Sequence, residues 1–192
     1  MRLLSLLKSE TADAHTALEQ NLNLFEQVRT KEDYRRLLIR FFTLHEPLEQ
    51  RLADALDWPA LGFDFTARRK APLARHDLRT LGATDPDLDA LPRAAALPAI
   101  DSHAAAVGCL YVLEGSTLGG QFISKHFAST LGLTPETGGR FFHGYGPHTA
   151  TRWREFGQWA EQQSTNASSD FDTRAIAAAR NTFHSFAQWL NR

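Results

Sequence analysis

The feature that most constrains the fold is a helical repeat of apolar residues that runs through nearly the whole chain. Near the N-terminus it is carried by Leu4, Leu7, Thr11, Ala14, His15, Leu18, Leu22 and Phe25. These spacings of three and four place the residues on one helical face. A second repeat predicts a helix that begins after a cap at Thr30. Further repeats predict helices over about 72–81, 101–131, 149–163 and 170–191. The sequence therefore predicts an all-α fold, an irregular helical bundle that forms a single domain over residues 1–192.

Composition restricts the classes of partner and the compartment. Hydrophobic residues make up 43% of the chain, which is an ordinary globular composition. The formal net charge is −1, so the protein has no overall positive field that would attract nucleic acid. No run approaches the roughly 20 apolar residues of a membrane span. Cys109 is the only cysteine, which excludes an internal disulfide, and the apolar run Met1–Leu7 is too short for a signal peptide. We expect a cytoplasmic protein without a nucleic-acid partner or membrane insertion.

His15 is the most informative of the histidines. It lies on the apolar side of the first predicted helix, so we expect its ring to point inward. Glu19 follows one turn later, at a rise of about 6 Å. A carboxylate there can accept the Nδ1 proton and leave Nε2 free for a metal or a haem iron. A buried histidine satisfied by its helix neighbour explains the same spacing.

Three glycines lie close together in the longest predicted helix, at Gly115, Gly119 and Gly120. Each costs about 1 kcal/mol relative to alanine in a helix interior. The first two are four residues apart and leave one helical face without side chains, where a flat ligand fits. Close contact with another helix explains the spacing equally well.

Two segments resemble the haem oxygenase family. The segment 8–19, KSETADAHTALE, is similar to the proximal helix of these enzymes, and 111–121, YVLEGSTLGGQ, to their distal helix. The distal version is that of bacterial enzymes paired with bacteriophytochromes. The similarity continues through Phe141–Phe142, the 151–154 stretch and Phe183, and so covers nearly the whole chain.

The resemblance implies that haem lies between the first helix and the glycine-containing helix. His15 would be the iron ligand, hence the metal-binding residue, and Glu19 its acceptor. Gly115, Ser116 and Gly119 would form the catalytic distal surface, with Gly120 also against the haem. Lys8 and Arg154 match basic positions near the propionates, and Phe183 matches an aromatic position that lines the pocket.

The implied reaction is the oxygen-dependent opening of haem to biliverdin, carbon monoxide and ferrous iron. Haem is then cofactor and substrate, molecular oxygen is consumed, and an external reductant of the ferredoxin or reductase type supplies electrons. A bacteriophytochrome is a possible recipient of biliverdin. Ser116 and Gln158 depart from animal enzymes, which carry an aspartate and an arginine at these positions, and Ala12 replaces another basic residue. The water network is therefore arranged differently, and the resemblance does not determine the in-plane haem orientation or the meso carbon that is attacked.

Alternative functions remain open from the residues alone. One is a haem carrier that releases haem intact, and another is a thiamin-processing relative that uses Cys109. A purely structural interaction protein leaves the helix-interior glycines unexplained. The basic run Arg68–Lys70 is interpreted as a solvated helix start, with docking of an acidic electron donor as the alternative.

Overall fold

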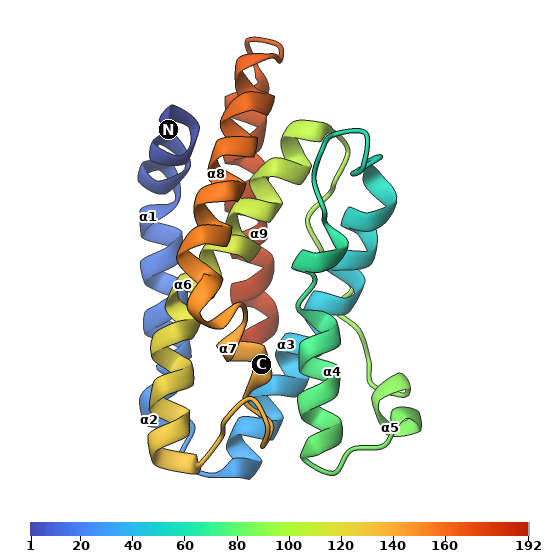
Figure 1. Cartoon of the computed structure of the whole chain (residues 1–192), viewed down its shortest axis with the longest axis vertical. Helices are drawn as coiled ribbons and strands as arrows, with labels where there is room; N and C mark the ends of the chain where they lie inside the picture. The colour runs from blue at the N-terminus through green and yellow to red at the C-terminus, as the bar shows by residue number, and fades with distance from the viewer. Residues whose placement is uncertain (192) are drawn as a thin grey trace.

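The computed structural model describes residues 1–191, and every regular element within them is a helix (Figure 1). The long helices are α1 (Arg2–Leu22), α3 (Lys31–Ala55), α4 (Ala71–Thr80), α6 (His103–Leu131), α8 (Thr149–Thr165) and α9 (Phe171–Leu190). The short ones are α2 (Leu24–Gln27), α5 (Asp85–Asp89), α7 (Arg140–His143) and the 3₁₀ turns η1 (Thr66–Arg68) and η2 (Gly146–His148). The all-α prediction is confirmed, while residue 192 of the predicted domain lies outside the described range.

Local capping explains where the long helices begin and end. Thr30 and Asp33 form a reciprocal capping box at the start of α3, as predicted. At the start of α6 the Ser102 side chain accepts a hydrogen bond from the backbone N–H of Ala105. Gly132 ends α6 in the left-handed conformation, with φ +68°. These signals made the start of α3 and both ends of α6 predictable from the sequence.

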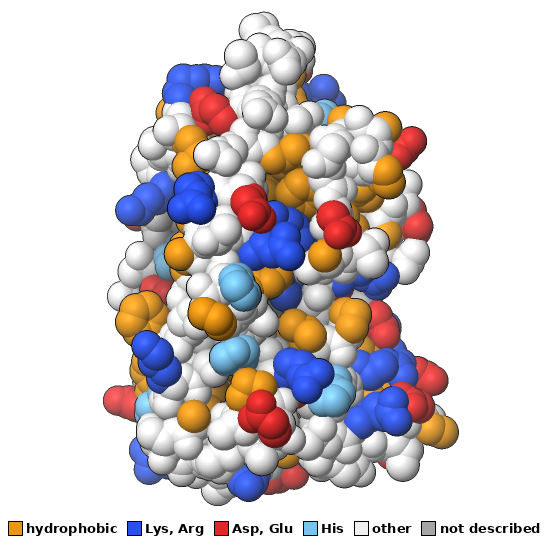
Figure 2. Space-filling view, in the orientation of Figure 1, with side chains coloured by type: hydrophobic (Ala, Val, Ile, Leu, Met, Phe, Trp, Pro, Cys, Tyr) orange, Lys and Arg blue, Asp and Glu red, His pale blue; other side chains and the backbone are white. Residues whose placement is uncertain are grey.

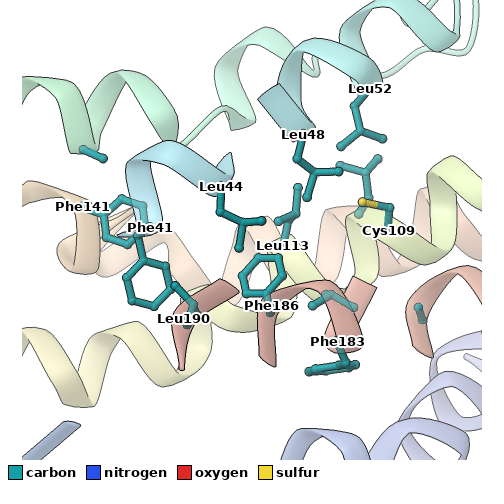
Figure 3. Close-up of a cluster of buried hydrophobic side chains, with 14 of the residues drawn as sticks. Phe41, Leu44, Leu48, Leu52, Cys109, Leu113, Phe141, Phe183, Phe186 and Leu190 are labelled. Carbon is teal, nitrogen blue, oxygen red and sulfur yellow. The ribbon is translucent and has the colours of Figure 1, made fainter. Parts of the chain in front are cut away.

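The core lies where α6 packs along α9, with α3 on one side and α1 and α8 on the other (Figure 1). Figure 3 shows the part of this core that is built from α3, α6 and α9, with Leu48, Cys109, Leu113 and Phe186 among the labelled side chains. The α6 and α9 backbones approach closely at Gly108, where a Cβ would stand 2.0 Å from the Ala175 carbonyl oxygen. Helix α6 is therefore fixed at the centre of the molecule.

The first predicted helix is shorter than its apolar repeat suggested. Asn23 adopts a left-handed conformation with φ +33°, which ends α1 and starts the single turn of α2. Phe25 therefore leaves the buried face and is 52% exposed. The prediction that Phe25 continues the α1 face is wrong, because one left-handed residue changes the direction of the chain.

No helix among the described residues combines the length and apolar character that a membrane span requires.

Candidate functional site

Two contacts join the N-terminal helices to α6 and define the ends of a shared surface. Tyr111 of α6 lies beside Thr11 of α1, whose side chain partly counteracts the rise that burial causes in the Tyr111 pKa. Further along, the ring centroids of Phe25 and His126 are 4.5 Å apart. Both helices run in the same direction (Figure 1). His15, one turn beyond Thr11, is therefore level with Gly115, one turn beyond Tyr111, at a rise of about 6 Å.

The α6 surface between these contacts is loosely packed at its two glycines. A Cβ placed on Gly119 would meet nothing within 4 Å, and one on Gly115 would meet the Trp153 ring at an ordinary 3.7 Å. Leu118 is 38% exposed and Phe122 is 72% exposed on the same stretch. An exposed apolar surface with bare backbone at its centre suits a flat apolar ligand.

His15 lies at the edge of the buried face of α1. Its side chain is 55% exposed, so the prediction that the ring points inward is wrong. Thr11 and Leu18 take the buried positions, and His15 shares the exposed stripe of Lys8 and Glu19. The ring contacts Phe183 of α9 edge-on, with centroids 5.7 Å apart and an interplanar angle of 70°. This contact sets where the imidazole lies on the surface.

The orientation of the His15 ring differs from the expected one. Nε2, rather than Nδ1, faces the Glu19 Oε1 atom, at 3.5 Å. The ring is exposed on the side away from Phe183. The predicted pairing of His15 with Glu19 therefore exists, but through the other nitrogen.

Comparison with known proteins supports the relationship across the whole chain. A family model described as heme oxygenase matches residues 1–192. The chain belongs to the haem oxygenase family. A heme oxygenase from Xanthomonas campestris pv. campestris (strain 8004) is 33% identical over 156 residues, which cover 81% of this chain and 87% of the relative. Heme oxygenase PigA of Pseudomonas aeruginosa is 29% identical over 185 residues, which cover 95% and 88% respectively.

Membership of the haem oxygenase family makes the chain an enzyme that degrades haem to biliverdin, with haem as substrate and cofactor. This decides against an inert carrier and a purely structural protein. The thiamin-processing alternative also fails at Cys109, which is fully buried. Burial raises the pKa of that thiol to about 12 despite a hydrogen bond with Thr182, so the thiol stays protonated and shielded.

Two predicted propionate ligands lie near the Tyr111 end of this surface. Lys8 precedes Thr11 by one turn, and Arg154 follows Trp153, whose ring contacts Gly115. Both cations are exposed, and within residues 1–191 neither forms an ion pair. They are thus available to an anionic group at the edge of the ligand.

The structure separates the glycines that the sequence grouped together. Gly115 and Gly119 face the loosely packed surface, whereas a Cβ on Gly120 would stand 2.9 Å from the Phe142 carbonyl oxygen. Gly120 is buried against α7, which is a packing role that the haem-contact prediction had missed. The helix-contact interpretation is thus confirmed at Gly120, while the flat-ligand interpretation of Gly115 and Gly119 stays a prediction.

Ser116 is exposed beside the glycine face. Its hydroxyl donates to the Leu113 carbonyl oxygen at 2.8 Å, a hydrogen bond within the helix. The oxygen keeps its own lone pairs for an acceptor role toward water.

The interpretation of Arg68–Lys70 as a solvated helix start is wrong. Arg68 and Lys70 are buried and both contact the carboxylate of Glu114. On the face shown in Figure 2, basic and acidic side chains are interspersed rather than gathered by sign. Because Arg68 is buried, it is not available as a docking residue for an acidic electron donor. Glu114 was missed as a structural residue, although a lone carboxylate in an apolar helix interior needs a buried cation.

Proposed function

We propose that His15 binds the haem iron and that the bare backbone of α6 at Gly115 and Gly119 covers the opposite face of the ring. The observation that carries this proposal is the level placement of His15 and Gly115 between two inter-helix contacts, with open space at Gly119 and only ordinary contact with Trp153 at Gly115. Glu19 orients the imidazole, and Phe183 supports its edge.

The residues present fit a flat macrocycle. Any side chain at Gly119 would project into the space that the ring needs, and the exposed Leu118 and Phe122 offer apolar contact. Lys8 and Arg154 would hold the propionates at the solvent edge by charge. When bound, haem supplies the iron at which oxygen is activated and the ring carbon that is oxidised.

The chain's own contribution is to restrict proton delivery. The distal positions 115–119 carry no imidazole and no carboxylic acid, so this stretch of α6 would offer no strong proton donor to the face of the haem that it covers. Ser116 would hold a water that delivers the single proton required. Gly115 and Gly119 would bring the α6 backbone close to this face of the ring and would limit the space beside it.

Molecular oxygen and electrons have to come from outside the chain. We assign the electrons to a ferredoxin or reductase type of donor and biliverdin delivery to a bacteriophytochrome, on the basis of the EGSTLGG form of the distal helix. The single, buried cysteine supports a reducing, cytoplasmic location.

The deciding experiment is an absorption spectrum of the haem complex of His15→Ala. We expect loss of the histidine-ligated spectrum and of biliverdin formation under air with a reductant, and partial recovery of the spectrum by added imidazole. His76→Ala, at an exposed histidine of α4, is the matched control and should behave as wild type. A histidine-type spectrum of His15→Ala without imidazole would show that another residue binds the iron.

A further inference from the structure

A buried charged cluster lies directly beneath the glycine face of α6. It consists of Glu114, Arg68, Lys70 and Tyr145, and we call it the Glu114 cluster. Glu114 is 1% exposed and its two cationic partners are at most 6% exposed. Glu114 immediately precedes Gly115, so its side chain leaves the helix one residue, or about 100°, from the proposed haem contact.

Both oxygens of Glu114 are held. Arg68 Nη1 donates to Oε2 at 2.5 Å and Lys70 Nζ donates to Oε1 at 3.0 Å. The Tyr145 hydroxyl accepts from Lys70 Nζ at 2.6 Å and donates to Glu114 Oε1 at 2.7 Å. Burial, and then the Glu114 charge, raises the pKa of Tyr145, so the phenol keeps the proton that it donates.

The cluster also fixes the neighbour of Gly115 on α8. Arg68 Nη1 donates to the Arg152 carbonyl oxygen at 3.2 Å, and Nη2 lies 3.3 Å from Glu155 Oε2. Trp153 stands between these two residues and contacts the Gly115 position with its ring. The Arg68 guanidinium therefore joins α6 to α8 at two residues that flank Trp153, which borders the proposed haem surface.

Stability alone does not account for a buried ion cluster at this place. Replacing such clusters by apolar residues of similar volume is often neutral or stabilising, because desolvation offsets the Coulomb attraction. What an apolar contact lacks is direction. Two cations from the segment 68–70 and a phenol from the turn at Tyr145 allow one position and one rotation of the Glu114 carboxylate.

We propose that Glu114 is a positioning residue of the reaction, which fixes the rotation of α6 and thereby selects the ring carbon that is oxidised. This inference rests on the proposed haem-binding surface. A turn of α6 about its axis would move Gly115 and Gly119 away from the level of His15. The ring edge that faces the bare backbone would change with it.

The test is the biliverdin isomer composition of Glu114→Gln, which keeps the side-chain volume and removes the charge. We expect haem to bind with a histidine-type spectrum, while the ratio of major to minor isomer changes by about tenfold, equivalent to about 1.4 kcal/mol. Tyr145→Phe removes one hydroxyl and keeps every charge, so it should shift the ratio in the same direction by less. Tyr145→Phe also tests the proposal if Glu114→Gln does not fold.

Glu46→Gln is the matched control, because it removes a part-buried carboxylate that is paired with Arg75 and Arg93, away from α6 and α8. We expect its isomer ratio to be that of wild type. A wild-type ratio in both Glu114→Gln and Tyr145→Phe, with haem bound, would overturn the positioning role. If wild type itself lacks a histidine-ligated spectrum, the proposed haem site fails instead, so the two failures are distinguishable.

Discussion

Helix α6 contains two pairs of glycines that differ in what surrounds them. At Gly108 and Gly120 an added Cβ would stand within 3 Å of a backbone carbonyl oxygen from another helix. At Gly115 the added atom would make ordinary contact, and at Gly119 it would meet nothing within 4 Å. The first pair lies in packed interfaces with α9 and α7, and the second lies on the surface level with His15.

Every helix-interior glycine costs stability by a similar amount, about 1 kcal/mol relative to alanine. At Gly108 and Gly120 close helix contact offsets this cost. At Gly119 nothing in the fold does. A residue that weakens its helix without helping the packing is best explained by ligand binding, so the comparison separates structural glycines from functional ones.

The strongest test of this comparison is Gly108→Ala. The new methyl group would stand 2.0 Å from the Ala175 oxygen, and two backbones would have to separate. We expect the free energy of unfolding to fall by about 3 kcal/mol, measured by urea denaturation. Gly120→Ala should lower the free energy of unfolding by less, because its Cβ would stand 2.9 Å from the Phe142 carbonyl oxygen. Wild-type stability for Gly108→Ala would contradict the close approach of α6 and α9.

The next largest effect is expected from Gly119→Leu. The side chain would occupy the space proposed for the ring but would contact no packed residue, so the fold should persist. We expect ring opening to fall at least about tenfold, measured as biliverdin formed per haem under air with a reductant. Ala128→Leu, at an exposed position of the same helix, is the control. Normal biliverdin yield from Gly119→Leu would contradict the distal role of this surface.

The smallest effect is a gain in stability. Gly119→Ala adds a good helix former at an exposed position with open space around it, so the free energy of unfolding should rise by about 0.5–1 kcal/mol. Thermal denaturation of the haem-free protein measures the gain. A loss of stability would mean that the Gly119 backbone has a packing role after all.

The sequence indicated the site residues through two local patterns. The His15–Glu19 spacing and the glycine interruption of the long helix are both visible without coordinates, and both lie on the proposed haem surface. The exposure of His15 was not predictable, because it depends on how far α9 covers the edge of α1. Arg68 and Lys70 were misinterpreted for a similar reason, since a basic run resembles a solvated segment until a buried carboxylate from another helix is placed beside it.

By itself the sequence determined the helices and most of their ends, because apolar periodicity and caps such as Thr30–Asp33, Ser102 and Gly132 act within a few residues. It also placed a histidine and a bare backbone on two separate helices. Only the tertiary structure decided which glycines pack and which stay open, and that Glu114 joins Arg68, Lys70 and Tyr145. Those outcomes depend on contacts between residues tens of positions apart, which local spacing does not encode.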